Sequence, residues 1–364
     1  MRVTLEDVCE KGASNLKQSD VVSMTGEYPI YGAAGYIRNV DFYHQEKPYV
    51  AIVKDGAGIG RTTLHPAKSS IIGTMQYLLP KDNVLPEYLY YVVRHMHLEK
   101  YFTGATIPHI YFRDYKNEKF NLDSLDKQAE IVEILEKAES VILKHRQQLN
   151  ELDNLIKARF VEMFGDPVQN PLKWVTKTLL EMGYCKNGVN FHSGDSGIEI
   201  HCLGVGDFKD YSVVDGTDYL PTISLSEEPP EESMLQDGDI VFVRSNGNKA
   251  LVGRCLVVYP HNTPTTYSGF CIRYRLTSDE VNTSYLLRVL KADSMRKKMI
   301  GHGANIQNLN QKTLATLNIP IPPMELQEQF AEFVNQTDKS KVAVQKALDE
   351  AQLLFDSLMQ KYFG

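Results

Sequence analysis

The sequence lacks the segments that would place it in or across a membrane. No stretch of 18 apolar residues occurs among its 364 residues, and residues 1–6 lack the apolar core of a signal peptide. These absences exclude a membrane-spanning helix and predict a cytoplasmic protein. The five cysteines form no CxxC pair, which indicates reduced thiols rather than a disulfide framework or a zinc site.

The common catalytic motifs are also missing. The sequence contains no Asn-Pro-Pro-Tyr or Asp-Pro-Pro-Tyr segment for amino-methyl transfer, since Glu228-Pro229-Pro230-Glu231 is not one. It has no Walker A, HExxH or GxSxG motif. No pattern points to a paired-carboxylate nuclease core. We therefore expect a protein that recognises a partner without catalysis of its own, and with no metal or cofactor bound to this chain.

Charge is unevenly distributed along the chain. The net charge of −7 argues mildly against a nucleic-acid ligand, but most of the deficit lies in two segments. Residues 120–169 and 317–364 carry −4 and −3, whereas residues 1–119 and 170–316 carry +1 and −1. The two near-neutral segments therefore leave room for a local basic face on each.

The sequence contains an internal repeat of two similar halves. Two amphipathic runs both close with Phe-Gly, at Phe164-Gly165 and Phe363-Gly364, an offset of 199 residues. The same offset holds upstream, where Gln128 matches Gln327 and residues 104–107 match residues 303–306. A period of this length indicates two domain-sized copies rather than a solenoid. Each copy is a globular part followed by a long helix, and the pair predicts a pseudo-two-fold particle.

The two helical runs carry apolar residues at coiled-coil spacing. One seam in each run steps by seven residues, and the second copy repeats the register of the first. The pattern is imperfect at His145, Arg159 and Lys341. Each run spans about 39 residues, or roughly 58 Å. The apolar seam residues are Leu135, Ile142, Leu149, Ile156 and Met163 in the first run, and Val334, Leu348, Phe355 and Tyr362 in the second.

A helix with one narrow apolar seam must cover that seam, and the nearest matching surface is the seam of the other copy. We therefore expect the two helices to pair with each other in antiparallel orientation. The alternative is that each helix packs on its own globular part. A polar seam residue such as His145 is either a register device or a place where the seam opens.

The globular parts read as mixed α and β. Short runs rich in β-branched and aromatic residues predict strands, and two amphipathic runs, the first with Pro86 near its start, predict helices. The predicted class is α+β, with two α/β domains separated by two long antiparallel coiled-coil helices. The predicted strands are residues 48–53, 239–244, 255–259 and 270–276, and the predicted helices are residues 85–94 and 284–290.

Each copy contains a Gly-rich or Asn-rich turn after a predicted strand, with cations at both ends. Residues 54–61 begin with Lys54 and end in Gly60-Arg61, and residues 244–254 begin with Arg244 and end in Gly253-Arg254. Neither run is followed by a helical pattern, so a nucleotide-binding loop is not expected. A hairpin tip with cations suits backbone phosphates. The alternative is an ordinary solvated hairpin.

A second loop is shared by the copies, at residues 104–109 and 303–308. Its Thr, His, Asn and Gln side chains suit base edges, although a histidine such as His109 is often structural. The strand residues Arg273 and Arg275, and Lys209, are further candidates in the second copy. The main candidate nucleic-acid contacts are Tyr36, Arg38, His44, Lys54, Arg61, Thr106, His109, Arg113 and Lys116, then Arg244, Asn246, Asn248, Lys249, Arg254, Asn305, Gln307 and Asn308.

Essentially the whole chain resembles the DNA-specificity subunit of type I restriction–modification systems. The most specific parts are residues 303–306, the downstream segment 317–327 and the Phe-Gly ends of both helices. The first copy departs from the pattern, because residues 121–128 lack the prolines of the second copy.

The resemblance implies a division of the chain into four parts. Residues 1–119 and 170–316 would be target-recognition domains, each reading half of a split, asymmetric target in double-stranded DNA. Residues 120–169 and 317–364 would be spacer helices, the first with its linker, on which two methyltransferase subunits dock. A restriction translocase would complete the enzyme, and S-adenosylmethionine and ATP with Mg²⁺ would belong to the partner subunits.

Three other interpretations of the sequence remain open. One is the specificity subunit of a type IIB-like system, whose partner is a fused methyltransferase–nuclease. The second is a coiled-coil interaction scaffold that binds only protein. The third is an enzyme with an unrecognised active site, which the missing motifs make the weakest of the three.

Overall fold

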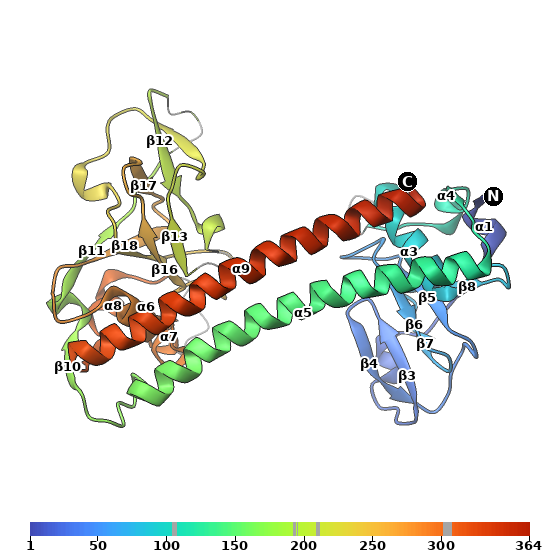
Figure 1. The fold of residues 1–364 in the computed structure, drawn as a ribbon, viewed down its shortest axis with the longest axis horizontal. Coiled ribbons are helices and arrows are strands. Elements are labelled where there is room, and N and C mark those ends of the chain that lie inside the picture. The colour runs from blue at the N-terminus through green and yellow to red at the C-terminus, as the bar shows by residue number, and fades with distance from the viewer. Residues whose placement is uncertain (104–107, 192–193, 195, 209–211, 301–307) are drawn as a thin grey trace. The chain divides into compact units, whose positions relative to one another are not determined.

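The computed structural model of the protein describes residues 1–103, 108–191, 194, 196–208, 212–300 and 308–364 (Figure 1). The chain forms two compact units. Unit 1 comprises Met1–Gln148 and Val344–Gly364, and unit 2 comprises Leu149–Ala343. Each unit therefore contains one globular region together with a part of each of the two long helices.

The globular region of unit 1 is built on an antiparallel sheet with the order β2-β8-β5-β6. Strand β5 is buried at every position, because its sequence Tyr-Val-Ala-Ile-Val supplies apolar side chains to both faces. A smaller sheet, β4-β3-β7, and the pair β1-β9 complete the region. The strands are β1 (Arg2–Thr4), β2 (Cys9–Ala13), β3 (Tyr28–Gly32), β4 (Gly35–Val40), β5 (Tyr49–Val53), β6 (Thr62–His65), β7 (Ser70–Ile71), β8 (Met75–Pro80) and β9 (Lys119–Asn121).

Helix α3 covers the core of this region. It begins at Pro86, whose missing N–H costs nothing in the first turn. It buries Tyr88, Leu89 and Val92 in the same cluster as Val50 of β5. The helical elements of the region are α1 (Leu5–Val8), α2 (Gln18–Val21), α3 (Pro86–His95), η1 (Leu98–Tyr101) and α4 (Phe112–Tyr115).

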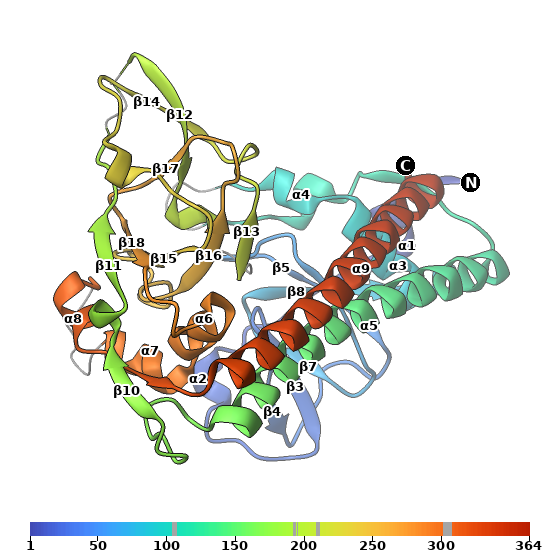
Figure 2. The same ribbon diagram turned by 60° about the vertical axis from the view of Figure 1, so that its left-hand side comes forward.

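The globular region of unit 2 repeats this plan. Its main sheet has the order β11-β18-β15-β16-β13, which Figure 2 shows, with β13 added beside β16. The smaller sheet β14-β12-β17 and the pair β10-β19 correspond to those of unit 1. The strands are β10 (Val175–Thr178), β11 (Gly183–Asn187), β12 (Ile198–Leu203), β13 (Val213–Asp215), β14 (Thr222–Leu225), β15 (Asp239–Val243), β16 (Cys255–Tyr259), β17 (Thr265–Tyr267), β18 (Cys271–Leu276) and β19 (Asn318–Ile321).

Helix α6 takes the place of α3 in unit 2. Its N-cap residue is Asn282, whose side chain accepts hydrogen bonds from the backbone N–H groups of Ser284 and Tyr285. The helical elements are η2 (Leu179–Glu181), η3 (Val205–Asp207), η4 (Glu231–Ser233), α6 (Thr283–Lys291), α7 (Asp293–Ile300) and α8 (Gln311–Ala315).

The predicted repeat, mixed class, strands and helices are confirmed. The predicted strands appear as β5, β15, β16 and β18, and the predicted helices as α3 and α6. Strand β9 occupies the same place as β19 although the first copy lacks the prolines of the second. The strand before the helix therefore does not depend on proline.

The two long helices are α5 (Leu125–Phe164) and α9 (Met324–Phe363), each of 40 residues. At 1.5 Å per residue each is about 60 Å long. Gly165 follows α5 with φ +74°, the left-handed conformation that ends many helices. Among the described residues no helix is long and apolar enough to cross a membrane.

In unit 1 the beginning of α5 packs on the end of α9. Leu135 and Ile142 of α5 lie in one buried cluster with Phe355 and Met359 of α9. Leu348 and Tyr362 are half-buried against the same cluster.

In unit 2 the end of α5 packs on the beginning of α9. Ile156 of α5 shares a buried cluster with Phe330 and Val334 of α9, and Met163 packs against it. Lys341, which interrupts the predicted seam, pairs its Nζ with Asp153 of α5 at 2.5 Å. Since the beginning of each helix meets the end of the other, the predicted antiparallel pairing is confirmed.

Both helices also pack on globular elements, so the two packing alternatives coexist. The Tyr91 hydroxyl of α3 donates to Glu139 of α5 at 2.8 Å. Phe330 of α9 shares a buried cluster with Tyr285 of α6, whose ring also stacks on that of Phe160 of α5 with centroids 5.8 Å apart. Near the middle of the two helices the apolar seam is less completely buried. Leu149 is only half-buried, and the His145 ring bonds to Gln148 of its own helix at 3.0 Å.

Candidate functional site

In unit 1 the two loops that stand out in the sequence lie side by side. Asp55, which follows β5, forms an isolated antiparallel bridge with His109. The Ile110 N–H donates to the Lys54 carbonyl at 3.0 Å, and the Gly56 N–H donates to the Pro108 carbonyl at 3.0 Å. The turn after β5 is therefore joined by backbone hydrogen bonds to the segment that precedes α4.

The same connection is made in unit 2. Ser245, which follows β15, forms the corresponding bridge with Asn308. The Leu309 N–H donates to the Arg244 carbonyl at 2.7 Å. Two loops that were matched only by sequence are thus brought together in the same way in both copies.

A third segment joins each of these places, and it was not predicted. The N–H groups of Lys54 and Asp55 donate to the Thr74 carbonyl at 3.0 and 3.3 Å. Those of Arg244 and Ser245 donate to the Phe270 carbonyl at 2.8 and 3.3 Å. We call Lys54, Asp55, Thr74 and His109 the first junction, and Arg244, Ser245, Phe270 and Asn308 the second junction.

Phe270 is the residue of the second junction that sequence analysis missed most clearly. Its side chain is 63% exposed although it is a large apolar group. A single exposed aromatic is common on protein surfaces. Its place directly before a buried strand, at a turn that meets the Arg244 loop, is what marks it as a candidate contact.

The Gly-Arg matches at the ends of the two turns have the same backbone hydrogen bonds. The Gly60 N–H donates to the Val53 carbonyl at 2.9 Å, and the Gly253 N–H donates to the Val243 carbonyl at 3.0 Å. Both glycines have positive φ, +80° and +74°, which side chains disfavour. A Cβ at Gly60 would also lie 2.5 Å from the Glu99 backbone nitrogen. Glycine is therefore required there by both conformation and space.

The side chains around the first junction form a series of polar and aromatic groups. His109 Nδ1 lies 2.7 Å from Asp55 Oδ1. The Tyr111 ring is stacked toward the His109 ring at a centroid distance of 6.4 Å, and the Arg113 guanidinium lies 4.8 Å from the Tyr111 centroid. Tyr111 is 46% exposed and is a second residue that sequence analysis missed.

Other candidates of unit 1 have structural partners as well. The Arg61 guanidinium donates to the Ala33 carbonyl. Arg38 donates to the carbonyls of Val21 and Met24 at 3.1 and 2.8 Å, so it caps the end of α2. Tyr36 is exposed, with its hydroxyl 3.2 Å from Asn39 Oδ1, and the His44 ring lies 3.5 Å from the Tyr77 hydroxyl.

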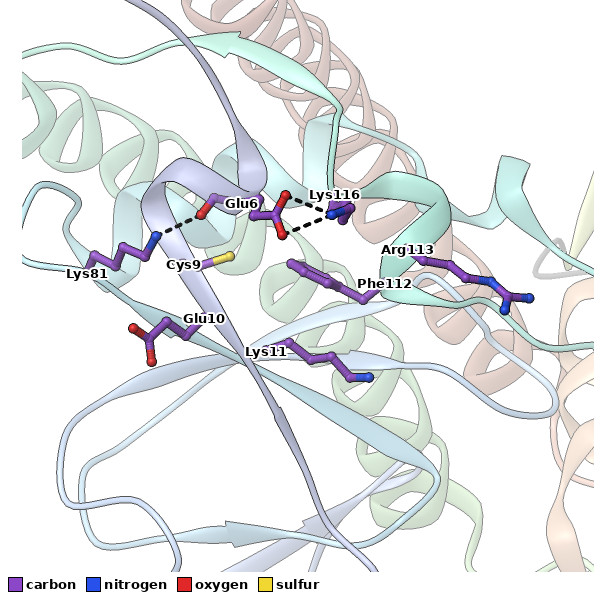
Figure 3. A pocket seen from close by; sticks show the side chains of 8 residues that line it. All are labelled: Glu6, Cys9, Glu10, Lys11, Lys81, Phe112, Arg113 and Lys116. Atoms are coloured by element: carbon purple, nitrogen blue, oxygen red, sulfur yellow. Dashed lines mark hydrogen bonds and ion pairs between the residues drawn. The ribbon is translucent and has the colours of Figure 1, made fainter.

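Arg113 and Lys116 line an open concavity of about 460 Å³ (Figure 3). The Lys116 Nζ pairs with Glu6 at 2.9 Å, and the Lys81 Nζ donates to the Glu6 carbonyl at 2.8 Å. Arg113 points away from this pair in Figure 3. Lys11 adds a further cation to the lining. The concavity therefore presents positive charge that is partly compensated by Glu6 and Glu10.

The candidates of unit 2 cluster on the turn after β15. Asn246 and Asn248 accept hydrogen bonds from backbone N–H groups two residues on, at 2.8 and 3.0 Å, which shapes the turn. Arg244 Nη1 donates to the Gly269 carbonyl at 3.2 Å, and Arg254 Nη1 to the Phe208 carbonyl at 3.5 Å. Lys249 lies exposed on the same turn.

The candidates Arg273 and Arg275 serve a structural role instead. Arg275 makes two 2.8 Å bonds to the Asp239 carboxylate, which raise the pKa of its guanidinium. Arg273 is fully buried beneath Tyr184, at 4.8 Å from the ring centroid. The prediction was wrong for Arg273, because its strand position faces inward. Lys209, Thr106, Asn305 and Gln307 lie outside the described residues.

No group of three or more His, Cys, Asp or Glu side chains within the described segments could hold a metal ion. The shared features of the two junctions are backbone geometry, cations and exposed aromatic or amide groups. Such surfaces bind a ligand by charge and hydrogen bonding.

Comparison with known proteins gives a consistent result. The family described as type I restriction modification DNA specificity domain matches residues 1–154 and 209–351. The chain is 22% identical over 331 residues to the type I restriction enzyme MjaVIII specificity subunit of Methanocaldococcus jannaschii, covering 82% of this chain and 76% of that protein.

It is 28% identical over 187 residues to the type I restriction enzyme StySPI specificity subunit of Salmonella potsdam. That match covers 49% of this chain and only 39% of the relative's length. Among solved structures, the S subunit of a type I restriction-modification system from M. genitalium is similar, with a TM-score of 0.59 and 16% identity over 100% of this chain and 96% of that one. At that identity the likeness concerns the fold alone.

Proposed function

Because the chain belongs to the type I restriction modification DNA specificity family, we propose that it is the DNA-reading subunit of a type I restriction–modification enzyme. It recognises a split, asymmetric target in double-stranded DNA, with one half-site read by each globular region. Methyl transfer and cleavage are carried out by partner subunits.

The observation that carries this proposal is the pair of junctions. Three backbone hydrogen bonds and one bridge are the same in both junctions. All four side chains differ: the cation is Lys54 or Arg244, and the other pairs are Asp55 and Ser245, Thr74 and Phe270, and His109 and Asn308. A constant frame with different side chains is what two half-sites of different sequence require, since base edges are read by side chains.

The candidate residues divide into two roles. Lys54, Arg61, Arg244, Lys249 and Arg254 hold backbone phosphates, which set position but carry no sequence information. His109 and Asn308 read base edges.

Several further residues are additional candidates for polar, aromatic or cationic contacts to DNA. These residues are Tyr36, Arg38, His44, Thr106, Arg113 and Lys116 in the first copy, and Asn246, Asn248, Asn305 and Gln307 in the second.

The paired helices are the docking platform for two methyltransferase subunits. Their seam residues are covered within the pair, so the partner contacts the outward faces. Leu353 and Leu354 of α9 are large apolar side chains that remain exposed, Leu353 at 70%. Adjacent exposed apolar groups support a covering partner. A restriction translocase binds the assembled complex, and S-adenosylmethionine and ATP with Mg²⁺ are held by these partners.

The division of the chain follows the same proposal. Residues 1–119 and 170–316 are the target-recognition domains, and residues 120–169 and 317–364 are the spacer segments. The protein works in the cytoplasm, where its five free cysteines stay reduced.

Two rivals are less favoured. A type IIB-like partner would be one fused methyltransferase–nuclease, whereas the MjaVIII and StySPI relatives are both named as specificity subunits of type I restriction enzymes. A protein-only scaffold would not need two junctions with equivalent backbones and different side chains.

The proposal is tested by methylation sequencing in a host free of DNA methylation. The full chain is co-expressed with the methyltransferase encoded beside it, and the methyltransferase alone is the control. A single split, asymmetric methylated motif that disappears without this chain supports the proposal. Methylation that is unchanged when the chain is omitted contradicts it and favours the scaffold.

A further inference from the structure

Gln128 is the fourth residue of α5, and its side-chain amide is fully buried. Its Oε1 accepts a hydrogen bond from the N–H of Leu85, the N-cap residue of α3, at 2.8 Å. Its Nε2 donates to the carbonyls of Asn83 and Asp123 at 3.0 and 2.9 Å. One side chain therefore joins the loop before α3, the turn before α5 and α5 itself.

Gln327 is the fourth residue of α9 and makes the same bonds in unit 2. It is also fully buried. Its Oε1 accepts from the N–H of Asn282, the N-cap residue of α6, at 2.9 Å, and its Nε2 donates to the carbonyls of Glu280 and Pro322 at 3.1 and 2.8 Å. Each partner stands at the position that corresponds to its counterpart in unit 1.

A tyrosine reinforces each of these connections. The Tyr88 hydroxyl of α3 donates to the Asn121 carbonyl of β9 at 3.0 Å. The Tyr285 hydroxyl of α6 donates to the Pro320 carbonyl of β19 at 3.0 Å. Each globular helix is thus bonded twice to the strand and turn that lead into the long helix.

Filling this space does not require an amide. An apolar side chain of similar size would pack there, but it would leave three partly or fully buried backbone groups without this partner, which is unfavourable because folding has already removed much of their contact with water. The hydrogen bonds fix direction as well as contact, because each needs its donor and acceptor aligned. The glutamine therefore sets the orientation of the long helix relative to the globular region that it follows.

We propose that Gln128 and Gln327 are positioning residues that set the number of base pairs between the two half-sites by locking each reading region onto its long helix. This inference rests on the proposed function. One base pair moves a half-site by about 3.4 Å along the duplex and turns it by roughly 35°, since about 10 base pairs make one helical turn. To admit such a change, the joint at the base of a reading region must give way by several ångströms and tens of degrees, which directed hydrogen bonds oppose.

The test uses the full chain in complex with its methyltransferase, after the wild-type motif has been established. Duplexes carry the wild-type half-sites with spacers lengthened or shortened by one and two base pairs. We expect the wild-type complex to prefer one spacer by at least about 100-fold, the loss that a misplacement near 1 Å can cause. We expect Gln327→Met to reduce that preference to about tenfold or less while the half-site bases remain the same.

The matched control is Gln329→Met, which makes the same chemical change two residues away at an exposed position. It should keep the wild-type spacer profile. Tyr285→Phe removes only the hydroxyl bond to Pro320 and is the milder second variant. It should broaden the profile in the same direction if Gln327→Met does not fold. Val40→Ala, in a separate core cluster, shows what lost stability alone does to the profile.

A spacer profile of Gln327→Met or Tyr285→Phe that superimposes on wild type, whatever the total activity, overturns the inference. A spacer profile of Val40→Ala that is broadened as much as that of Gln327→Met also overturns the inference. Either result leaves the proposed function intact, because the wild-type complex still reads two half-sites. A wild-type complex that methylates no split motif contradicts the proposed function itself.

Discussion

Phe363, the last residue of α9, packs the edge of its ring against Tyr88 of α3, with ring centroids 5.3 Å apart and planes at 74°. Phe164, the last residue of α5, makes the same contact with Tyr285 of α6, at 4.8 Å and 69°. The Phe-Gly ends that match in the sequence thus have one physical role. Each closes a core built from one globular region, the beginning of one long helix and the end of the other.

Phe363→Ala should destabilise unit 1 by about 3–5 kcal/mol, the usual cost of truncating a buried phenylalanine. Thermal unfolding measures the change, and Leu354→Ala, at an exposed position of the same helix, should shift the transition by less than about 0.5 kcal/mol. A Phe363→Ala protein as stable as the Leu354→Ala protein would show that α9 does not close the core of unit 1.

Ile142→Asp should disrupt the helix pair and prevent assembly with the methyltransferase. The residue is buried against α9, and a buried carboxylate without a partner costs on the order of 3–5 kcal/mol. Ser140→Asp places the same charge at an exposed position of that turn and should assemble normally. Co-purification with the methyltransferase distinguishes them. Assembly that survives Ile142→Asp would mean that the paired helices are not the docking platform.

Lys54→Ala should weaken binding to all DNA sequences alike and lower its salt dependence. If Lys54 neutralises one phosphate, the slope of log K against log salt falls by about 0.9. Lys137→Ala, which removes an exposed cation on α5, is the control and should leave the slope unchanged. The measurement is a titration of the assembled complex at several salt concentrations. An unaltered slope for Lys54→Ala removes the phosphate role from that residue.

His65 should make unit 1 less stable at mildly acidic pH. It is buried between Tyr31 and Tyr49, and burial lowers the pKa of its imidazole to about 4. In the unfolded chain the pKa of the His65 imidazole is near 6.5, so the unfolded state binds a proton at a pH where the native state does not. The free energy of unfolding therefore falls as the pH drops from about 6.5 to about 4. The full loss is about 3 kcal/mol.

Urea unfolding of wild type and His65→Phe at several pH values isolates this contribution. The difference in unfolding free energy between the two proteins should be constant above about pH 6.5 and should change in favour of the variant below it. A pH-independent difference would show that His65 is protonated as readily in the native state as in the unfolded chain.

The long helices and the repeat were predictable because they depend on spacing. The seven-residue spacing of apolar residues, such as Leu135 and Ile142, lies within one helix and does not depend on the loops. The apolar seam that it forms predicts which face of the helix packs against a partner. The pairing of the loops at Asp55 and His109 was predictable only as a shared motif in each copy. Nothing local in the sequence says that the two loops touch, because their contact is made by backbone atoms.

Other parts of the site could not be read from the sequence for related reasons. Phe270 joins the second junction through its carbonyl oxygen, which every residue type possesses. Arg38 reads as a free cation, but its guanidinium caps α2, a contact between residues 14–17 positions apart. Arg273 lies on a strand that is covered on both faces, and its side chain points inward. The alternation of side chains along such a strand therefore does not predict whether Arg273 is buried or exposed.

If each junction reads its own half-site, methylation sequencing of two single variants will show it. His109→Ala and Asn308→Ala are each co-expressed with the methyltransferase in a host free of DNA methylation, with the wild-type chain as the reference. We expect each variant to relax the base preference of one half-site, a different half-site for each, and to leave the other half-site as in wild type. Variants that relax both half-sites together, or that lower methylation equally at every sequence, would contradict it.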